Sequence, residues 1–313
     1  MKSLVTGGAG FIGSHVVGLL LSEGHDVTVL DSLASGYREN LGRFPEARLI
    51  VGDVRDLSLL RVAARGAEVI FHLAASVGNK RSIEHPRLDA EINVLGTLNV
   101  LETARDIGVR KVVFSSSAGV FGELKTIPIS ENHPAEPTSP YGATKLCGEK
   151  LCLAYANIYT PIEAVCLRYF NVYGVNQRYD AYGNVIPIFA YRLLRRECIT
   201  VFGDGEQTRD FINVADVARA NLLAAKSRGL SGAFNVGSGS RVSINALVTI
   251  MRETSGLDAK VLHAPLRAGD VRDSLADISA IRSTLGFEAR VDLRSGLREY
   301  IDWAKTSLSG WAI

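Results

Sequence analysis

The sequence predicts an α/β protein built on a doubly wound parallel sheet, with a smaller lobe formed by its C-terminal half. In the first half, short apolar runs rich in β-branched residues alternate with longer segments whose apolar residues recur every three to four positions. This alternation of strand and helix is typical of a parallel sheet with crossover helices. A glycine-rich loop directly after the first run points the same way, and after residue 170 the segments become shorter and richer in glycine and charge.

The individual elements follow from the same periodicities. Helices are expected over residues 11–22 and 90–107, where apolar side chains recur at helical spacing. The strand runs are apolar throughout, so they should be buried on both faces of the sheet. Strands are expected at residues 3–6, 26–30, 48–51, 69–73 and 111–115.

Composition excludes several classes of protein. The formal net charge is +2 and the basic residues are scattered, so nothing indicates a nucleic-acid partner. No run approaches the roughly 20 apolar residues of a membrane span, and no signal peptide is recognisable, so we expect a soluble, cytoplasmic protein. Neither the six histidines nor the cysteines show metal-ligand spacing, and we expect no metal and reduced thiols at Cys147, Cys152, Cys166 and Cys198.

The glycine-rich loop predicts a dinucleotide site. Gly7, Gly10 and Gly13 lie three apart between the first strand and the first helix. Glycine lets the backbone approach a pyrophosphate at the helix N-terminus, where free N–H groups and the helix dipole favour anions. Asp31 lies eighteen residues beyond the last glycine, at the end of the second strand. Its carboxylate can bind both adenosine-ribose hydroxyls and would repel a 2′-phosphate, so a Rossmann site for NAD is expected.

A second acidic residue has two readings. Asp53 and Val54 follow the third strand, where they could border the adenine. Asp53 could equally be the N-cap of a helix that begins at Arg55.

A tyrosine, a lysine and three serines form the candidate catalytic set. Tyr141 and Lys145 are four residues apart, so they share one face of a helix. The neighbouring ammonium is expected to lower the pKa of Tyr141 toward the range of a general base. Ser115, Ser116 and Ser117 end the fifth strand, near the carboxyl edge where open α/β sheets bind ligands.

With these features in place, the chain resembles the NAD-dependent epimerase/dehydratase family of extended short-chain dehydrogenases/reductases, and most of all its UDP-sugar 4-epimerases. The resemblance runs from about residue 2 to about residue 303. It is carried by TGGAGFIG at 6–13, HLAA at 72–75, SSSAGVFG at 115–122, SPYGATK at 139–145, RYFNVYG at 168–174, FGDGEQTRDFINVADV at 202–217, FNVGSG at 234–239 and RAGDVRDSLAD at 267–277.

The resemblance implies an oxidation and reduction at C4 of the sugar. Tyr141 would take the C4 hydroxyl proton, Lys145 would hold the nicotinamide ribose, and Ser117 would bind the reacting oxygen. NAD would accept the C4 hydride and return it to the other face after the keto sugar has rotated. The cofactor residues it implies are Gly7, Gly10, Phe11, Ile12, Gly13, Asp31, Ser32, Asp53, Val54, Leu73, Ala74, Ala75, Asn93, Ser115, Tyr141, Lys145 and Tyr169.

The implied substrate residues suit an anionic nucleotide, because guanidinium groups match diphosphate oxygens. Arg209 could instead form a surface ion pair with Asp204, Glu206 or Asp210. Asp270 matches a contact to the uridine ribose. The full set is Ser117, Tyr141, Asn171, Arg178, Val185, Arg209, Arg267, Asp270 and Ser274.

The residues after Ser117 favour epimerisation among the reactions of the family. Dehydratases carry an acid and a base where this chain has Ala118 and Gly119, and decarboxylating relatives place a glutamate at the second position. Ser274 leaves room for an N-acetyl group where relatives restricted to plain hexoses carry tyrosine. Arg178 matches an arginine of uronate epimerases, so UDP-glucuronate 4-epimerisation, or another nucleotide-sugar oxidation, stays an alternative. A non-catalytic NAD-binding regulator is a further alternative.

The organisation of the chain completes the expectations. Residues 1–170 should form the NAD-binding domain with the catalytic residues. Residues 171–313 should mainly form the substrate-binding lobe, with some segments returning to the sheet. The resemblance also implies a homodimer, formed through helices at about 86–107 and 141–159.

Overall fold

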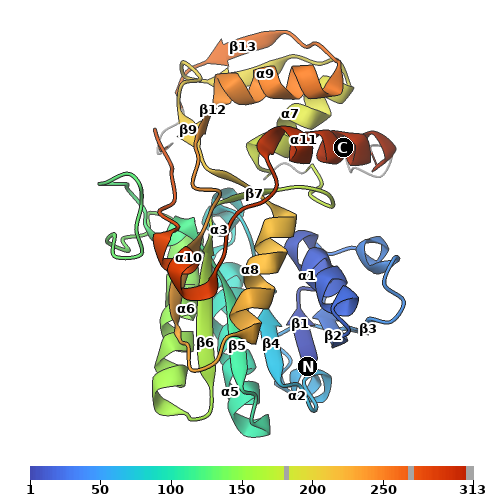
Figure 1. Ribbon diagram of the computed structural model, residues 1–313, viewed down its shortest axis with the longest axis vertical. Helices are drawn as coiled ribbons and strands as arrows, with labels where there is room; N and C mark the ends of the chain where they lie inside the picture. Colours follow the sequence, from blue (N-terminus) through green and yellow to red (C-terminus); the bar gives the residue numbers. More distant parts are fainter. Residues whose placement is uncertain (180–182, 267–270, 308–313) are drawn as a thin grey trace.

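A seven-stranded parallel sheet forms one half of the molecule (Figure 1). The structure is a computed structural model that describes residues 1–179, 183–266 and 271–307. The strand order is β11-β6-β5-β4-β1-β2-β3, which confirms the doubly wound fold and places the reversal of strand order between β1 and β4. The strands are β1 (Lys2–Thr6), β2 (Asp26–Asp31), β3 (Arg48–Val51), β4 (Val69–His72), β5 (Lys111–Ser117), β6 (Glu163–Tyr169) and β11 (Gly232–Val236).

Helices cover both faces of this sheet. One face packs against Val16 and Val17 of α1 and Val217 of α8, the other against Leu101 of α5 and Cys152 of α6. None of the described helices is both long and apolar enough to cross a membrane. The covering helices are α1 (Phe11–Ser22), α8 (Val214–Lys226) and α10 (Ser279–Leu285) on one face, and α2 (Leu57–Ala63), α5 (Gly96–Ile107) and α6 (Pro140–Ile158) on the other.

The helix expected over residues 90–107 is interrupted. It consists of α4 (Pro86–Ala90), a π-helical turn η2 (Glu91–Leu95) and α5. A π turn carries one extra residue per turn, and such turns are frequent at functional sites. The periodicity of the sequence does not reveal this insertion. It gives Asn93 a direction that a regular helix would not.

The second half of the chain builds a lobe beyond the carboxyl ends of the strands (Figure 1). This lobe has its own apolar core, which includes Phe189, Leu247 and Tyr300. Its helices are α7 (Val185–Leu194), α9 (Ile244–Ser255) and α11 (Leu293–Ser307), and its strand pairs are β7 (Asn171–Tyr173) with β10 (Phe211–Asn213), β8 (Ile199–Phe202) with β13 (Val261–Ala264), and β9 (Thr208–Arg209) with β12 (Val242–Ser243).

Segments of both halves meet in the sheet layer, because β11, α8 and α10 come from the second half of the sequence. A division at residues 170 and 171 therefore stays a prediction. Three short elements complete the described chain: η1 (Arg38–Leu41), α3 (Asn79–Glu84) and η3 (Ala118–Val120).

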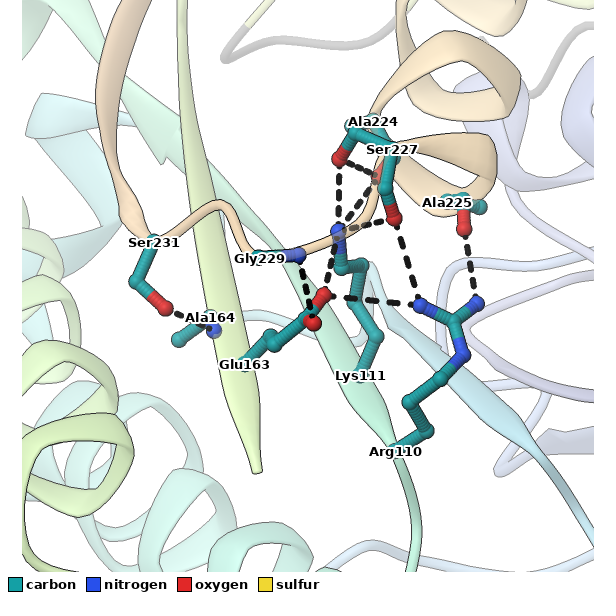
Figure 2. Close-up of polar contacts among 9 residues, drawn as sticks. All are labelled: Arg110, Lys111, Glu163, Ala164, Ala224, Ala225, Ser227, Gly229 and Ser231. Atoms are coloured by element: carbon teal, nitrogen blue, oxygen red, sulfur yellow. Dashed lines mark hydrogen bonds and ion pairs between the residues drawn. The ribbon is translucent and has the colours of Figure 1, made fainter. Parts of the chain in front are cut away.

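A buried lysine at the start of β5 ties the end of α8 to the sheet (Figure 2). The side chain of Lys111, the first residue of β5, is fully buried and its Nζ lies 2.8 Å from Oε2 of Glu163. Nζ also donates to the carbonyl oxygens of Ala224 at 3.2 Å and Ser227 at 2.7 Å. These carbonyls end α8, where the helix has free acceptors and the negative end of its dipole. The ammonium therefore caps the helix and neutralises Glu163 at once.

Replacing Lys111 by methionine is expected to destabilise the protein by about 3 kcal/mol, because two buried carbonyls would each lose a donor and Glu163 would keep only Arg110 and the Gly229 N–H as partners. Urea unfolding followed by circular dichroism measures this loss. Lys226→Met is the matched control, since Lys226 ends the same helix and its ion pair with Glu23 is exposed on both sides. The control should unfold close to wild type. Equal midpoints for the two variants would contradict the assignment.

Candidate active site

A cavity of about 870 Å³ lies between the carboxyl ends of the sheet and the second lobe. In doubly wound sheets this crevice is the general place of ligand binding. The first turn of α1 and the end of β5 border it on one side, and α7, β8 and β9 on the other. These predicted site residues line it: Phe11, Ile12, Ser117, Tyr141, Tyr169, Asn171, Val185, Arg209 and Ser274.

The loop between β1 and α1 needs its glycines. Gly7 has φ of +71°, and a Cβ there would lie 2.6 Å from the backbone nitrogen of Ala74. A Cβ on Gly13 would lie 2.1 Å from the Gly7 carbonyl oxygen. Gly10 is the N-cap of α1 and provides no side-chain acceptor. The N–H groups of the first turn thus remain available for an anion, which fits the diphosphate of a dinucleotide.

Asp31 is held in place by this loop. The carboxylate is buried at the end of β2, where Oδ2 accepts from the N–H of Ala9 at 2.9 Å and Oδ1 from that of Leu33 at 2.8 Å. A Cβ on Gly36 would lie 2.9 Å from Oδ1, so only glycine lets the chain pass here. Each carboxylate oxygen has a second lone pair for a ribose hydroxyl. Asp31 therefore fits the adenosine ribose of NAD.

One of the two readings of Asp53 is wrong. Helix α2 begins at Leu57, and its N-cap is Asp56, whose Oδ1 accepts from the Leu59 N–H at 3.0 Å. Asp53 instead pairs with Arg55 at 2.8 Å. The sequence offers two aspartates three residues apart, and the later one takes the cap because the helix starts later. A position of Asp53 beside adenine stays a prediction.

The catalytic candidates come together on β5 and α6. Ser139 caps α6 by accepting from the Gly142 N–H at 3.1 Å, so Tyr141 lies in its first turn. The Tyr141 hydroxyl hydrogen-bonds Ser117, whose Oγ also accepts from the Gly119 N–H at 3.1 Å. Ser117 is thereby fixed by the turn after β5 and aimed at the phenol.

The ammonium of Lys145 lies deeper in the site. The side chain is 3 % exposed, with Nζ 3.4 Å from Ser115 Oγ and 4.8 Å from the centre of the Phe114 ring. Burial lowers the pKa of Lys145 to about 8. This lysine is therefore near the point of titration at neutral to mildly alkaline pH.

The prediction that the protein lowers the pKa of Tyr141 is wrong: without a bound ligand, its surroundings raise this pKa. Burial raises the pKa of Tyr141 to about 12, and Asp89 acts in the same direction, while the hydrogen bond from Ser117 opposes them. Desolvation of a phenolate outweighs one hydrogen bond. A general base at this position needs further positive charge from a bound ligand, and the oxidised nicotinamide ring of NAD carries one.

Asn93 supports the helix that carries the catalytic pair. It accepts from the Ser76 N–H at 2.8 Å and donates to the Ser76 carbonyl oxygen at 3.0 Å. Its Nδ2 also donates to Oγ1 of Thr144 at 3.1 Å, and Thr144 donates to the buried Asp89 at 2.6 Å. The π turn thus joins the loop after β4 to α6, between Tyr141 and Lys145.

The other cofactor candidates border the same loop. The N–H groups of Leu73 and Ala74, after β4, donate to the carbonyl and hydroxyl oxygens of Thr6. Ser32 is exposed beyond β2. The Tyr169 hydroxyl donates to Asn221 at 3.1 Å, and burial raises its pKa. Tyr169 therefore offers the cavity its ring rather than a free hydroxyl.

The substrate candidates occupy the opposite wall. Asn171 donates from Nδ2 to the Asp210 carbonyl oxygen at 3.2 Å, and Arg209 from Nη1 to that of Thr208 at 2.8 Å. Thr208 also accepts from the N–H of Ser274, at 3.1 Å, which fixes Ser274 in the wall. Asn171, Arg209 and Ser274 thus belong to one connected patch.

Three candidates differ from this picture. Arg267 and Asp270 lie outside the described residues. The guanidinium of Arg178 lies over the ring of Tyr37, 3.6 Å from its centre, and Tyr37 belongs to the loop after Asp31. The structure thus places Arg178 beside the dinucleotide half of the site.

Two buried glutamines were missed by sequence reasoning. Gln177 and Gln207 are more than nine-tenths buried and line the cavity. Their Nε2 groups donate to backbone carbonyls, whereas each Oε1 has no partner among the described residues. They provide buried acceptors for a ligand with N–H or O–H donors. An isolated glutamine has no characteristic spacing, so no pattern in the sequence points to these two.

Fold and site together define an α/β enzyme with a dinucleotide loop and a serine–tyrosine–lysine centre below a second, ligand-covering lobe. A family model described as the NAD dependent epimerase/dehydratase family matches residues 3–237. The chain belongs to this family.

Individual relatives are similar over nearly their whole length. A putative UDP-glucose 4-epimerase of Methanocaldococcus jannaschii is 40% identical over 97% of this chain and 98% of its own. The crystal structure of UDP-glucose 4-epimerase with UDP-glucose from Thermotoga maritima has a TM-score of 0.93 and 38% identity, and it covers 98% of this chain and 100% of its own. UDP-N-acetylglucosamine 4-epimerase from Methanobrevibacter ruminantium, in complex with UDP-N-acetylmuramic acid, has a TM-score of 0.93, 35% identity and 98% coverage of both chains.

Proposed function

We propose that the protein is an NAD-dependent UDP-sugar 4-epimerase that interconverts UDP-glucose and UDP-galactose. The observation that carries this proposal is the contact of Ser117 and Tyr141 at the wall of a cavity roofed by the second lobe, with the ammonium of Lys145 buried deeper, beside Ser115. NAD, when bound, supplies the acceptor and donor of the C4 hydride. Tyr141 takes and returns the proton of the C4 hydroxyl, Ser117 orients that oxygen, and Lys145 provides positive charge beside them.

The residues around the phenol support epimerisation rather than elimination. Ala118 and Gly119 line the cavity next to Ser117, and neither can give or take a proton. Loss of water from the sugar would need such a group. Oxidation and reduction at a single carbon need only the three residues present and NAD as hydride acceptor and donor.

NMR analysis of the purified protein with UDP-glucose, UDP-N-acetylglucosamine and UDP-glucuronate tests the function. We expect the 4-epimer of UDP-glucose to form without net NADH, which absorbance at 340 nm monitors. Accumulating NADH would indicate an oxidoreductase that releases a keto product. Absence of turnover in a protein that binds NAD would favour a regulator. Epimerisation of UDP-glucuronate is not favoured, because Arg178, which suggested it, lies over Tyr37.

The N-acetyl pair is a further proposed substrate. Ser274 lines the cavity and is 9 % exposed, so its small side chain leaves space that a larger one would fill. Ser274→Tyr is expected to reduce kcat/KM for UDP-N-acetylglucosamine at least about ten-fold, through overlap with the acetyl group, and to change that for UDP-glucose little. Ser274→Ala, which keeps the space, is the control. Equal losses on both sugars would contradict the idea.

We also propose a homodimer, in the cytoplasm. Apolar side chains are exposed on α4, η2 and α6: Leu88 is 41 %, Leu95 53 % and Ile158 65 % exposed. Exposed apolar side chains on helices that pack together favour association with a second copy. Light scattering should give twice the chain mass for wild type and the chain mass for Leu95→Arg. Leu262→Arg, the same substitution at an exposed leucine on β13, should remain dimeric. A monomeric wild type would rule the dimer out.

A further inference from the structure

A segment of the second lobe returns to the first turns of α1. The carbonyl oxygen of Val175 accepts from Nε2 of His15 at 2.9 Å, and Nδ2 of Asn176 donates to Ser14 Oγ at 3.0 Å. Asn176 has φ of +70°, which turns the chain sharply here. The segment after β7 is thus fixed to the helix end that fits a diphosphate.

Arg178 extends from this segment across to the Asp31 loop. Its guanidinium lies 3.6 Å from the centre of the Tyr37 ring, a stacked cation–π contact. Tyr37 is itself fixed, since its N–H donates to the carbonyl oxygen of Ala9 at 2.9 Å, and its neighbour Gly36 lies against the Asp31 carboxylate. The stack therefore joins the second lobe to the loop that fits the adenosine ribose.

The contact with Tyr37 leaves part of the Arg178 guanidinium without a hydrogen-bond acceptor. Its Nε is buried and has no hydrogen-bond partner among the described residues. A buried guanidinium N–H without an acceptor is costly and indicates a missing partner. Residues 6–13 contain no lysine or arginine, so the loop itself offers a diphosphate only N–H groups and the helix dipole. A phosphate is the acceptor that a guanidinium matches best.

We propose that Arg178 and Tyr37 form a clasp over bound NAD, in which Arg178 supplies positive charge to the diphosphate and the stack closes the gap between the lobes. The proposal rests on the proposed function, because an epimerase regenerates its cofactor in every turnover and gains by retaining it. The clasp slows release of the dinucleotide. It takes no part in reading the sugar.

The test measures release of NAD from the loaded protein, by trapping freed NAD with an NAD-consuming dehydrogenase. Arg178→Ala and Tyr37→Ala should release NAD about ten-fold faster than wild type, the effect of losing roughly one charged, stacked contact. Arg178→Lys keeps the charge without the planar stack and should be intermediate. Tyr37→Phe keeps the ring and should restore slow release. Arg195→Ala is the control, since Arg195 lies over Tyr191, 5.3 Å from its ring centre, on α7.

Binding of UDP to the NAD-loaded variants separates the alternatives. The clasp predicts unchanged UDP affinity together with faster NAD release. Unchanged NAD release with weakened UDP binding would assign Arg178 to the substrate and overturn the proposal. Unchanged NAD release together with unchanged UDP affinity would also overturn it, because the stack would then contribute only to packing. Arg178→Lys and Tyr37→Phe decide the matter if an alanine variant does not fold. A wild-type protein that binds no NAD would instead overturn the proposed function itself.

Discussion

Tyr141→Phe is expected to lower kcat about 10³-fold while NAD remains bound. The substitution removes only the hydroxyl that hydrogen-bonds Ser117. That hydroxyl is the proposed carrier of the substrate proton, and a positioned acid–base group contributes roughly 10²–10⁴ to rate. The glycine loop and Asp31 do not depend on it. NMR-detected turnover and NAD content per protein chain measure the two effects separately.

Tyr155→Phe is the matched control, because Tyr155 lies on the same helix, away from the cavity. It should turn over at the wild-type rate. If Tyr141→Phe retained more than about a tenth of wild-type activity, the phenol would not be the base.

The ionisation of Tyr141 provides a second readout. With burial raising its pKa to about 12, the phenol is neutral near pH 7 in protein freed of NAD. Positive charge beside it stabilises the phenolate, so NAD⁺ should move the titration to lower pH. The difference in tyrosinate absorbance between wild type and Tyr141→Phe follows this shift. Titration at the same pH with and without NAD⁺ would contradict it.

Local patterns in the sequence were sufficient for the parts of the site that lie within one element. Gly7 is set by its positive φ and Gly13 by its contact with Gly7, both inside a single turn. Tyr141 and Lys145 are set by one turn of one helix. For such residues, the spacing in the sequence determines the arrangement in space. The order of the family motifs along the chain agrees with these local patterns. The fold was predictable as well, because an alternation of strands and helices is compatible with few topologies.

Other features depend on packing between distant segments, which spacing does not encode. The pKa of Tyr141 is governed by its burial and by Asp89, and the direction of Arg178 by its contact with Tyr37, more than a hundred residues earlier in the chain. From its position at the start of a strand, Lys111 would be expected to be exposed to solvent. It is buried because the end of α8 packs over it. Such properties become visible only in three dimensions.

Lys145 should give the second large effect, and its sign follows from burial. Because burial lowers its pKa to about 8, the side chain is an ammonium below that pH and loses its charge as pH rises through it. If the charge stabilises the developing phenolate, kcat should fall on the alkaline side with a midpoint near pH 8, and Lys145→Met should lower kcat about 10²-fold at pH 7.

The variant Lys145→Arg separates charge from fit. Arginine stays protonated throughout this range, so the alkaline fall should disappear, although the larger group, placed where Lys145 is 3 % exposed against Phe114, should reduce the maximal rate. Lys150→Met, an exposed position on the same helix, is the control and should keep the wild-type profile. An alkaline fall that persists in Lys145→Arg would mean that another group titrates, and the lysine would then position the site without its charge being needed.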